Sequence, residues 1–69
     1  MRIFIQPPMP SDSPDSLAIC ACEVLRHSLI LSAQIGGIIG NEAVVLVAPH
    51  DVTLAIAALK RAGMEAVAK

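Results

Sequence analysis

Cys20 and Cys22 are separated by one residue, and this C-x-C spacing is the first feature of the sequence that suggests metal chemistry. A metal site needs side chains that converge on one ion. If the segment is helical, residues two apart are rotated by about 200°, so the two thiols point to opposite sides. The spacing therefore argues against chelation or a disulfide by this pair. We predict Cys20 in the core and Cys22 in a partly exposed position.

The two histidines, His27 and His50, are the other candidate metal ligands. Both lie near the expected ends of structural elements, and only Asp51 beside His50 adds a further ligand type. A zinc site needs several convergent ligands and a supporting second layer of hydrogen bonds. We therefore predict no metal site and no cofactor.

Candidate nucleophiles and bases gather in one short segment that contains Ser11, Asp12, Ser13 and Asp15. Catalysis needs a nucleophile, a base and an orienting group within reach of one another. Residues of these types are also those that begin helices, which explains their presence. The glycine-rich run 36–40 lacks the Lys-Ser/Thr pair of a phosphate-binding loop and precedes an expected strand. The sequence therefore predicts a binding domain and not an enzyme.

The charge distribution argues against nucleic acid as a partner. The 69 residues carry a formal net charge of -1, and Lys60-Arg61 is the only adjacent pair of cations. Nucleic-acid-binding domains present a basic stripe and often stacking aromatic side chains, whereas Phe4 is the only aromatic residue here. The length suits a single domain spanning residues 1–69.

The most apolar stretch, residues 29–48, has about the length of a membrane span. Gln34, Asn41 and Glu42 interrupt it, so we interpret it as two strands joined at Gly40-Asn41. The N-terminus lacks the apolar core of a signal peptide before the prolines at positions 7, 8 and 10. These features predict a cytoplasmic protein without a membrane segment.

The order of expected elements is strand, helix, strand, strand, helix, strand. The first helix starts at Ser13-Pro14, and the second follows Asp51 and ends near Gly63. Strands are expected over residues 2–6, 29–39, 43–48 and 64–68, with Ile3 and Ile5 on one face of the first strand and Phe4 on the other. The buried stripe of the first helix is expected to comprise Leu17, Cys20, Ala21, Val24 and Leu25. This order predicts an α+β domain of the ferredoxin-like βαββαβ class, with two helices on one face of a four-stranded antiparallel sheet.

The strand at 43–48 is apolar on both faces, although two helices cover only one face of such a sheet. Apolar surface left open in this way usually marks an interface. We therefore predict a homo-oligomer, a dimer or higher, that associates through the sheet. The pair Gly36-Gly37 predicts a bulge or a close backbone approach in the preceding strand.

Two stretches carry a resemblance to a known family. The run from Asp12 to Ala18, D-S-P-D-S-L-A, resembles the D-x-P-G-x-L-A start of the first helix in ACT domains. Residues 55–67 resemble the end of such a domain, where a helix runs into A-L-x-x-A-G and a final strand. The related NIL-type ligand domains of transporter ATPases fit the same pattern.

The resemblance implies a regulatory domain that binds amino acids or similar small molecules where domains associate. Carried over to this chain, it implies ligand contacts at Asp12, Asp15, Ser16 and Leu17, with Gln34 on the neighbouring strand. Asp15 stands where the family pattern has glycine, and its carboxylate would repel the α-carboxylate of an amino acid. That difference favours the alternative function, a protein-interaction or oligomerisation module with no metabolite ligand.

Overall fold

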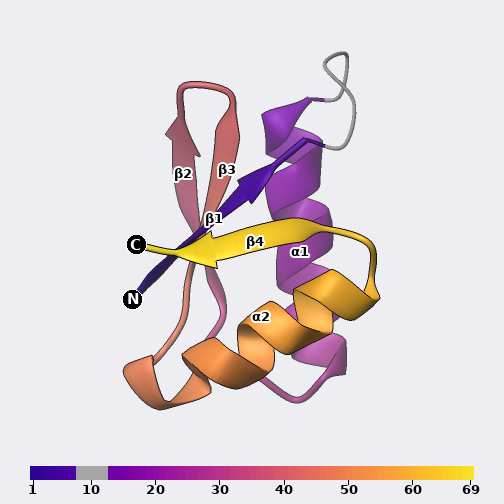
Figure 1. The fold of residues 1–69 in the computed structure, drawn as a ribbon, viewed down its shortest axis with the longest axis vertical. Coiled ribbons are helices and arrows are strands. Elements are labelled where there is room, and N and C mark those ends of the chain that lie inside the picture. Colours follow the sequence, from indigo (N-terminus) through magenta and orange to yellow (C-terminus); the bar gives the residue numbers. More distant parts are fainter. Residues whose placement is uncertain (8–12) are drawn as a thin grey trace.

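The chain forms a four-stranded antiparallel sheet and two α-helices (Figure 1). The computed structural model describes residues 1–7 and 13–69. Its elements are β1 (Arg2–Gln6), α1 (Pro14–His27), β2 (Gln34–Ile39), β3 (Glu42–Leu46), a 3₁₀ turn η1 (Pro49–Asp51), α2 (Val52–Arg61) and β4 (Glu65–Ala68). The strand order is β2-β3-β1-β4, so the first and last strands are neighbours. The prediction of an α+β chain with this antiparallel sheet is confirmed.

Both helices pack on one face of the sheet, because strand residues alternate between two environments. In β1, Ile3 and Ile5 are fully buried against the helices, whereas Phe4 faces the opposite side as predicted. On β3, Ala43 and Val45 lie on the helix side. The helices contribute most of the rest of this core, namely Leu17, Ala18, Ala21, Cys22, Leu25, Ala55, Ala58 and Leu59.

Helix α1 begins at the predicted position, with Ser13 as N-cap and Pro14 in the first turn, although the Ser13 side chain makes no capping bond. Its buried side differs from the prediction. Cys22 is buried and Cys20 is exposed, so the assignment of these two cysteines was wrong. The Cys22 thiol lies 3.6 Å from the carbonyl oxygen of Ala33, which shows that the segment after the helix covers this side of α1.

The predicted strand from residue 29 starts only at Gln34. Residues 28–33 instead close helix α1 with a Schellman motif. The amide of Ile30 donates to the carbonyl oxygen of Leu25 at 2.9 Å, and the amide of Leu29 donates to that of Arg26 at 3.0 Å. Leu29 has a φ of +64° and an 83% exposed side chain, while Ile30 turns inward to the core. A capping turn therefore overrides the β-like composition of this segment.

Leu29→Gly is expected to raise the free energy of unfolding by about 0.5–1 kcal/mol. Leucine pays a steric cost at positive φ that glycine avoids, and little buried surface is lost because the side chain is exposed. The measurement is urea denaturation followed by circular dichroism. Leu31→Gly is the control, since Leu31 is 75% exposed but lacks a positive φ. A destabilised Leu29→Gly variant would show that the leucine side chain has a structural role.

Helix α2 starts after Asp51, but the side chain of Asp51 does not cap it. Its carboxylate instead accepts a hydrogen bond from the Ser32 hydroxyl at 2.8 Å, and the Ser32 oxygen accepts one from the amide of Ala48 at 3.1 Å. The helix ends as predicted. Gly63 has a φ of +86°, and the amide of Met64 donates a hydrogen bond to the carbonyl oxygen of Leu59 at 3.0 Å. The residue that follows the C-cap of a helix often adopts a left-handed backbone conformation, and it is usually glycine.

Strand β2 contains the predicted irregularity. Ile35 pairs with Val45 and Gly37 pairs with Val44, so Gly36 is an extra residue without a counterpart on β3. The bulge places Ile35 and Ile38, three residues apart, on the helix side of the sheet, opposite Val45 and Ala43. The predicted turn at Gly40-Asn41 then leads into β3.

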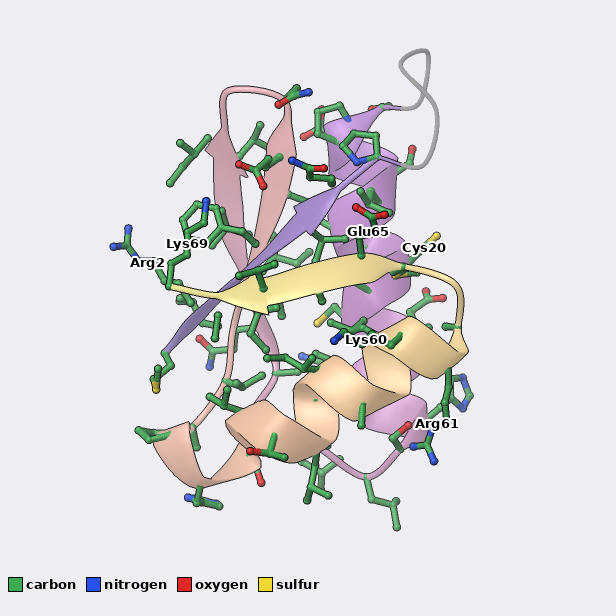
Figure 2. The ribbon with its side chains drawn as sticks, in the orientation of Figure 1. Arg2, Cys20, Lys60, Arg61, Glu65 and Lys69 are labelled. Atoms are coloured by element: carbon green, nitrogen blue, oxygen red, sulfur yellow. The ribbon has the colours of Figure 1, made fainter. Side chains whose placement is uncertain are left out.

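Long side chains cover the face of the sheet that carries no helix. The Lys69 ammonium lies 4.7 Å from the centre of the Phe4 ring and 3.9 Å from a carboxylate oxygen of Glu42. Arg2 approaches the same ring at 5.7 Å, and Figure 2 shows it beside Lys69. Phe4 and Val44, which lie on this face, are only 8% and 1% exposed. The chain itself thus covers part of the apolar surface on which the predicted homo-oligomer was based, and that assembly stays a prediction.

Candidate functional site

A groove of about 340 Å³ runs between helix α1 and the start of strand β2. Residues 19, 22, 23 and 26 form its helix wall, because residues three or four positions apart lie on the same side of a helix. Its strand wall is formed by the first two residues of β2. The lining consists of Ile19, Cys22, Glu23, Arg26, Gln34 and Ile35.

Arg26 is held at the groove by a hydrogen bond from Nη2 to the carbonyl oxygen of Ala33, at 3.3 Å. A guanidinium has five N–H donors, so this single bond leaves others for a ligand. Glu23 lies three residues earlier on the same helix, and the described residues contain no ion pair between it and Arg26. The groove therefore presents a cation and an anion side by side.

The opposite part of the groove is apolar. Ile19 on α1 and Ile35 on β2 are each 52% exposed. The buried Cys22 of α1 also lines this part of the groove. A second hollow of about 400 Å³, lined by Glu23, Arg26 and His27, adjoins the charged part. The arrangement suits a small molecule that carries both charges together with an apolar body.

The structure does not gather the predicted site residues in one place. Gln34 lines the groove, but Asp15 and Ser16 are exposed in the first turn of α1 and do not line it. Leu17 is 8% exposed and belongs to the core. Asp12 lies outside the described residues.

Sequence reasoning missed Glu23 and Arg26, which lie outside the buried stripe predicted for the first helix. The signal that points to them is the row Ile19, Glu23 and Arg26, an exposed isoleucine followed by opposite charges at i+4 and i+7. Such a row of residues can be recognised as the wall of a groove only when the element packed beside the helix is known. That neighbour is the start of β2, which the sequence placed inside a longer strand.

A second polar cluster joins Ser32, Asp51 and His50. The His50 Nε2 atom lies 3.6 Å from Asp51 Oδ1, and the Ser32 hydroxyl donates to Oδ2 of the same carboxylate. The hydroxyl and the imidazole thus both contact the Asp51 carboxylate, which stands at the centre of this cluster. This cluster joins the 28–33 segment to the start of α2. The described residues contain no group of three or more metal-ligating side chains.

Comparisons with family models, with curated proteins and with solved structures found no match for this chain. The groove therefore has to be interpreted from its own geometry. Within the part of the chain that the structure describes, no helix is long and apolar enough to cross a membrane.

Proposed function

We propose that this chain is a small-molecule-binding regulatory domain of the ferredoxin-like βαββαβ class, similar to amino-acid-binding ACT domains. The strand order β2-β3-β1-β4 and the packing of both helices on one face support that class. In this proposal the domain binds its ligand without catalysing a reaction. The two free cysteines, Cys20 and Cys22, are in keeping with a cytoplasmic location.

The observation that carries the proposal is the pairing of opposite charges with apolar walls in the α1–β2 groove. Arg26 suits the α-carboxylate of an amino acid, and Glu23 suits its ammonium group. Ile19 and Ile35 then provide the apolar surface for an aliphatic side chain. The volume of about 340 Å³ lies in the range of small-molecule sites.

This site differs from the one that the family resemblance implies. The resemblance points to the loop before α1 and to Asp15, whose carboxylate repels an amino acid's carboxylate. The groove offers a guanidinium for that carboxylate instead, and it retains Gln34 as a polar contact. Amino-acid binding therefore fits the groove better than the helix start.

The experiment is a thermal-shift panel of aliphatic amino acids on the wild type, Arg26→Gln and Glu23→Gln. A ligand at a hundredfold excess over its dissociation constant adds about 2.7 kcal/mol, which raises the melting temperature by about 10 °C or more in a domain of this size. We expect a dose-dependent rise with the wild type and its loss in both groove variants. Asp15→Asn is the matched control and should keep the response.

The opposite responses of the variants would contradict ligand binding in the groove. If Asp15→Asn abolishes the response and Arg26→Gln keeps it, the ligand binds at the start of α1. A flat panel with the wild type favours the alternative function, an interaction or oligomerisation module without a metabolite. The half-exposed side chains of Ile19, Ile35 and Ile39 support that alternative.

A further inference from the structure

Strand β4 forms one edge of the sheet, and no strand lies beyond it among residues 1–7 and 13–69. The opposite edge, β2, is interrupted by the bulge at Gly36, and a bulge makes an edge strand a poor template for a further strand. The register of β4 with β1 is regular from Glu65 to Ala68. Of the two edges, β4 is therefore the one that a further strand can extend.

The backbone groups of Ala66 and Ala68 point to this open edge. The amide of Lys69 donates a hydrogen bond to the carbonyl oxygen of Arg2 at 3.2 Å. In an antiparallel pair, residues whose backbone groups face the neighbouring strand alternate with residues whose groups face away from it. Because Lys69 faces β1, the N–H and C=O groups of Ala66 and Ala68 face away, and each of these residues offers one donor and one acceptor at the edge.

A hollow of about 430 Å³ lies beside this edge, and it is lined by Lys60, Gly63, Met64, Glu65, Ala66 and Val67. Figure 2 shows Lys60 between α2 and β4, whereas Arg61 points away from the strand. Neither Lys60 nor Glu65 forms an ion pair among the described residues. The open edge is therefore accompanied by a cation and an anion that have no charged partner.

The two charges stand on opposite faces of the strand. Ala66 pairs with Ile5 on the helix side, which is also the side of α2 and Lys60. Glu65 and Val67 pair with Gln6 and Phe4, so they lie on the face that carries no helix. Val67 is 56% exposed there. A strand added at this edge thus meets a cation on one face, and a carboxylate and an apolar side chain on the other.

We propose that β4 binds an extended peptide segment of another protein, which adds an antiparallel strand to the sheet. The backbone groups of Ala66 and Ala68 hold the peptide main chain, and the side chains beside them select its sequence. An antiparallel orientation matches the other pairs of this sheet and is the more stable one per residue.

Charge complementarity defines the sequence of the peptide. Its residue opposite Ala66 points into the hollow, where a glutamate carboxylate reaches the Lys60 ammonium. The residue before that glutamate lies opposite Val67, where an apolar side chain fits. The residue after it lies opposite Glu65, where a cation fits. The segment therefore reads apolar, glutamate, cation in the direction of its own chain.

A second copy of this chain matches the edge less well than such a peptide. Antiparallel pairing of two β4 strands about Val67 sets Ala68 of one copy opposite Ala66 of the other. An alanine then enters the hollow, and Lys60 keeps no charged partner. The glutamate of the proposed peptide supplies that partner, which favours a different protein as the occupant.

The test is fluorescence anisotropy of a labelled peptide, Thr-Val-Thr-Val-Glu-Lys-Thr, titrated with the protein. We expect saturable binding in the micromolar range. Lys60→Glu should raise the dissociation constant at least about tenfold, because two carboxylates then meet in the hollow. A peptide with lysine in place of its glutamate should regain affinity for that variant. Arg61→Glu is the matched control, because Arg61 does not line the hollow, and it should bind like the wild type.

Ala68→Pro tests the backbone contacts. Proline removes an N–H group that points to the open edge, and it leaves the bonds between β4 and β1 intact, so the variant should melt close to the wild type. It should lose affinity for the peptide at least about tenfold. In the wild type, the peptide should slow hydrogen exchange of the Ala66 and Ala68 amides, measured by NMR.

Several outcomes would overturn the proposal. These are a peptide that does not bind the wild type, binding that survives both Lys60→Glu and Ala68→Pro, and equal binding of the peptide with its sequence reversed. A chain that ignores the peptide and forms a dimer sensitive to Ala68→Pro would also overturn it, because the occupant is then a second copy. Lys60 and Ala68 do not line the α1–β2 groove, so peptide binding and the amino-acid response can each fail without the other.

Discussion

Leu25→Ala is expected to lower the free energy of unfolding by about 3 kcal/mol. Leu25 is fully buried in the core between the helices and the sheet. It is also the residue whose carbonyl accepts the amide of Ile30 in the turn that ends α1. Its truncation leaves a cavity at the point where helix, capping turn and sheet meet, and Ile30 loses its apolar neighbour.

The expected loss is large for this chain because a domain of 69 residues with one aromatic side chain has a small reserve of stability. A core of this size rarely supplies more than about 3–5 kcal/mol. The variant should therefore melt more than about 12 °C below the wild type or be largely unfolded at room temperature. Thermal and urea denaturation followed by circular dichroism measure the effect.

Leu31→Ala is the matched control for this prediction. It makes the same chemical change at a side chain that is 75% exposed. A surface substitution of this kind usually changes stability by less than about 0.5 kcal/mol. Equal losses in the two variants would contradict the core described for α1 and would mean that Leu31 is buried in solution, for instance by self-association.

The elements that the sequence predicted correctly depend on local rules. The alternation of Ile3, Phe4 and Ile5 was enough to orient β1, because adjacent strand residues point to opposite faces. Ser13-Pro14 located the start of α1, and Gly63 located the end of α2 through the conformation it alone adopts without cost. None of these predictions needed a contact between distant parts of the chain.

The wrong predictions concern features that are set by contacts between residues far apart in the sequence. Cys20 and Cys22 lie on opposite flanks of the α1 stripe, and local periodicity does not say which flank is covered. The segment that ends at Ala33 covers the Cys22 flank. That segment was itself predicted as strand, because its capping turn and the Ser32–Asp51 hydrogen bond are not visible in composition.

The candidate site shows the same division. Gln34 was selected through the family resemblance, as a residue of the strand beside the first helix, and it does line the groove. Glu23 and Arg26 were not selected, since charges opposite a buried stripe normally face solvent. Their role depends on how α1 packs beside β2, which the length of the preceding turn sets. Functional residues on a helix surface therefore need the neighbouring element before they can be recognised.

Gly36→Ala is expected to destabilise the chain by about 1–3 kcal/mol through crowding. A methyl group on Gly36 would lie 3.0 Å from Leu46 Cγ and 3.0 Å from Val44 Cγ1. Gly36 does not have a positive φ, so its backbone suits alanine and the cost comes from space. Gly37→Ala provides the contrast: Gly37 has open space around it but a φ of +110°, so its cost comes from the backbone.

A double-mutant cycle with Leu46→Ala separates these two causes. Leu46→Ala removes one of the two side chains that crowd Gly36, so Gly36→Ala should cost at least about 1 kcal/mol less in that background. The cost of Gly37→Ala should stay unchanged, because the space left by Leu46→Ala does not change the backbone φ at position 37. Additive effects for Gly36 and Leu46 would mean that the bulge, not the close approach, requires glycine at position 36. Since Gln34 and Ile35 enter the groove just before this bulge, the same variants also report whether the bulge positions the strand wall of the candidate site.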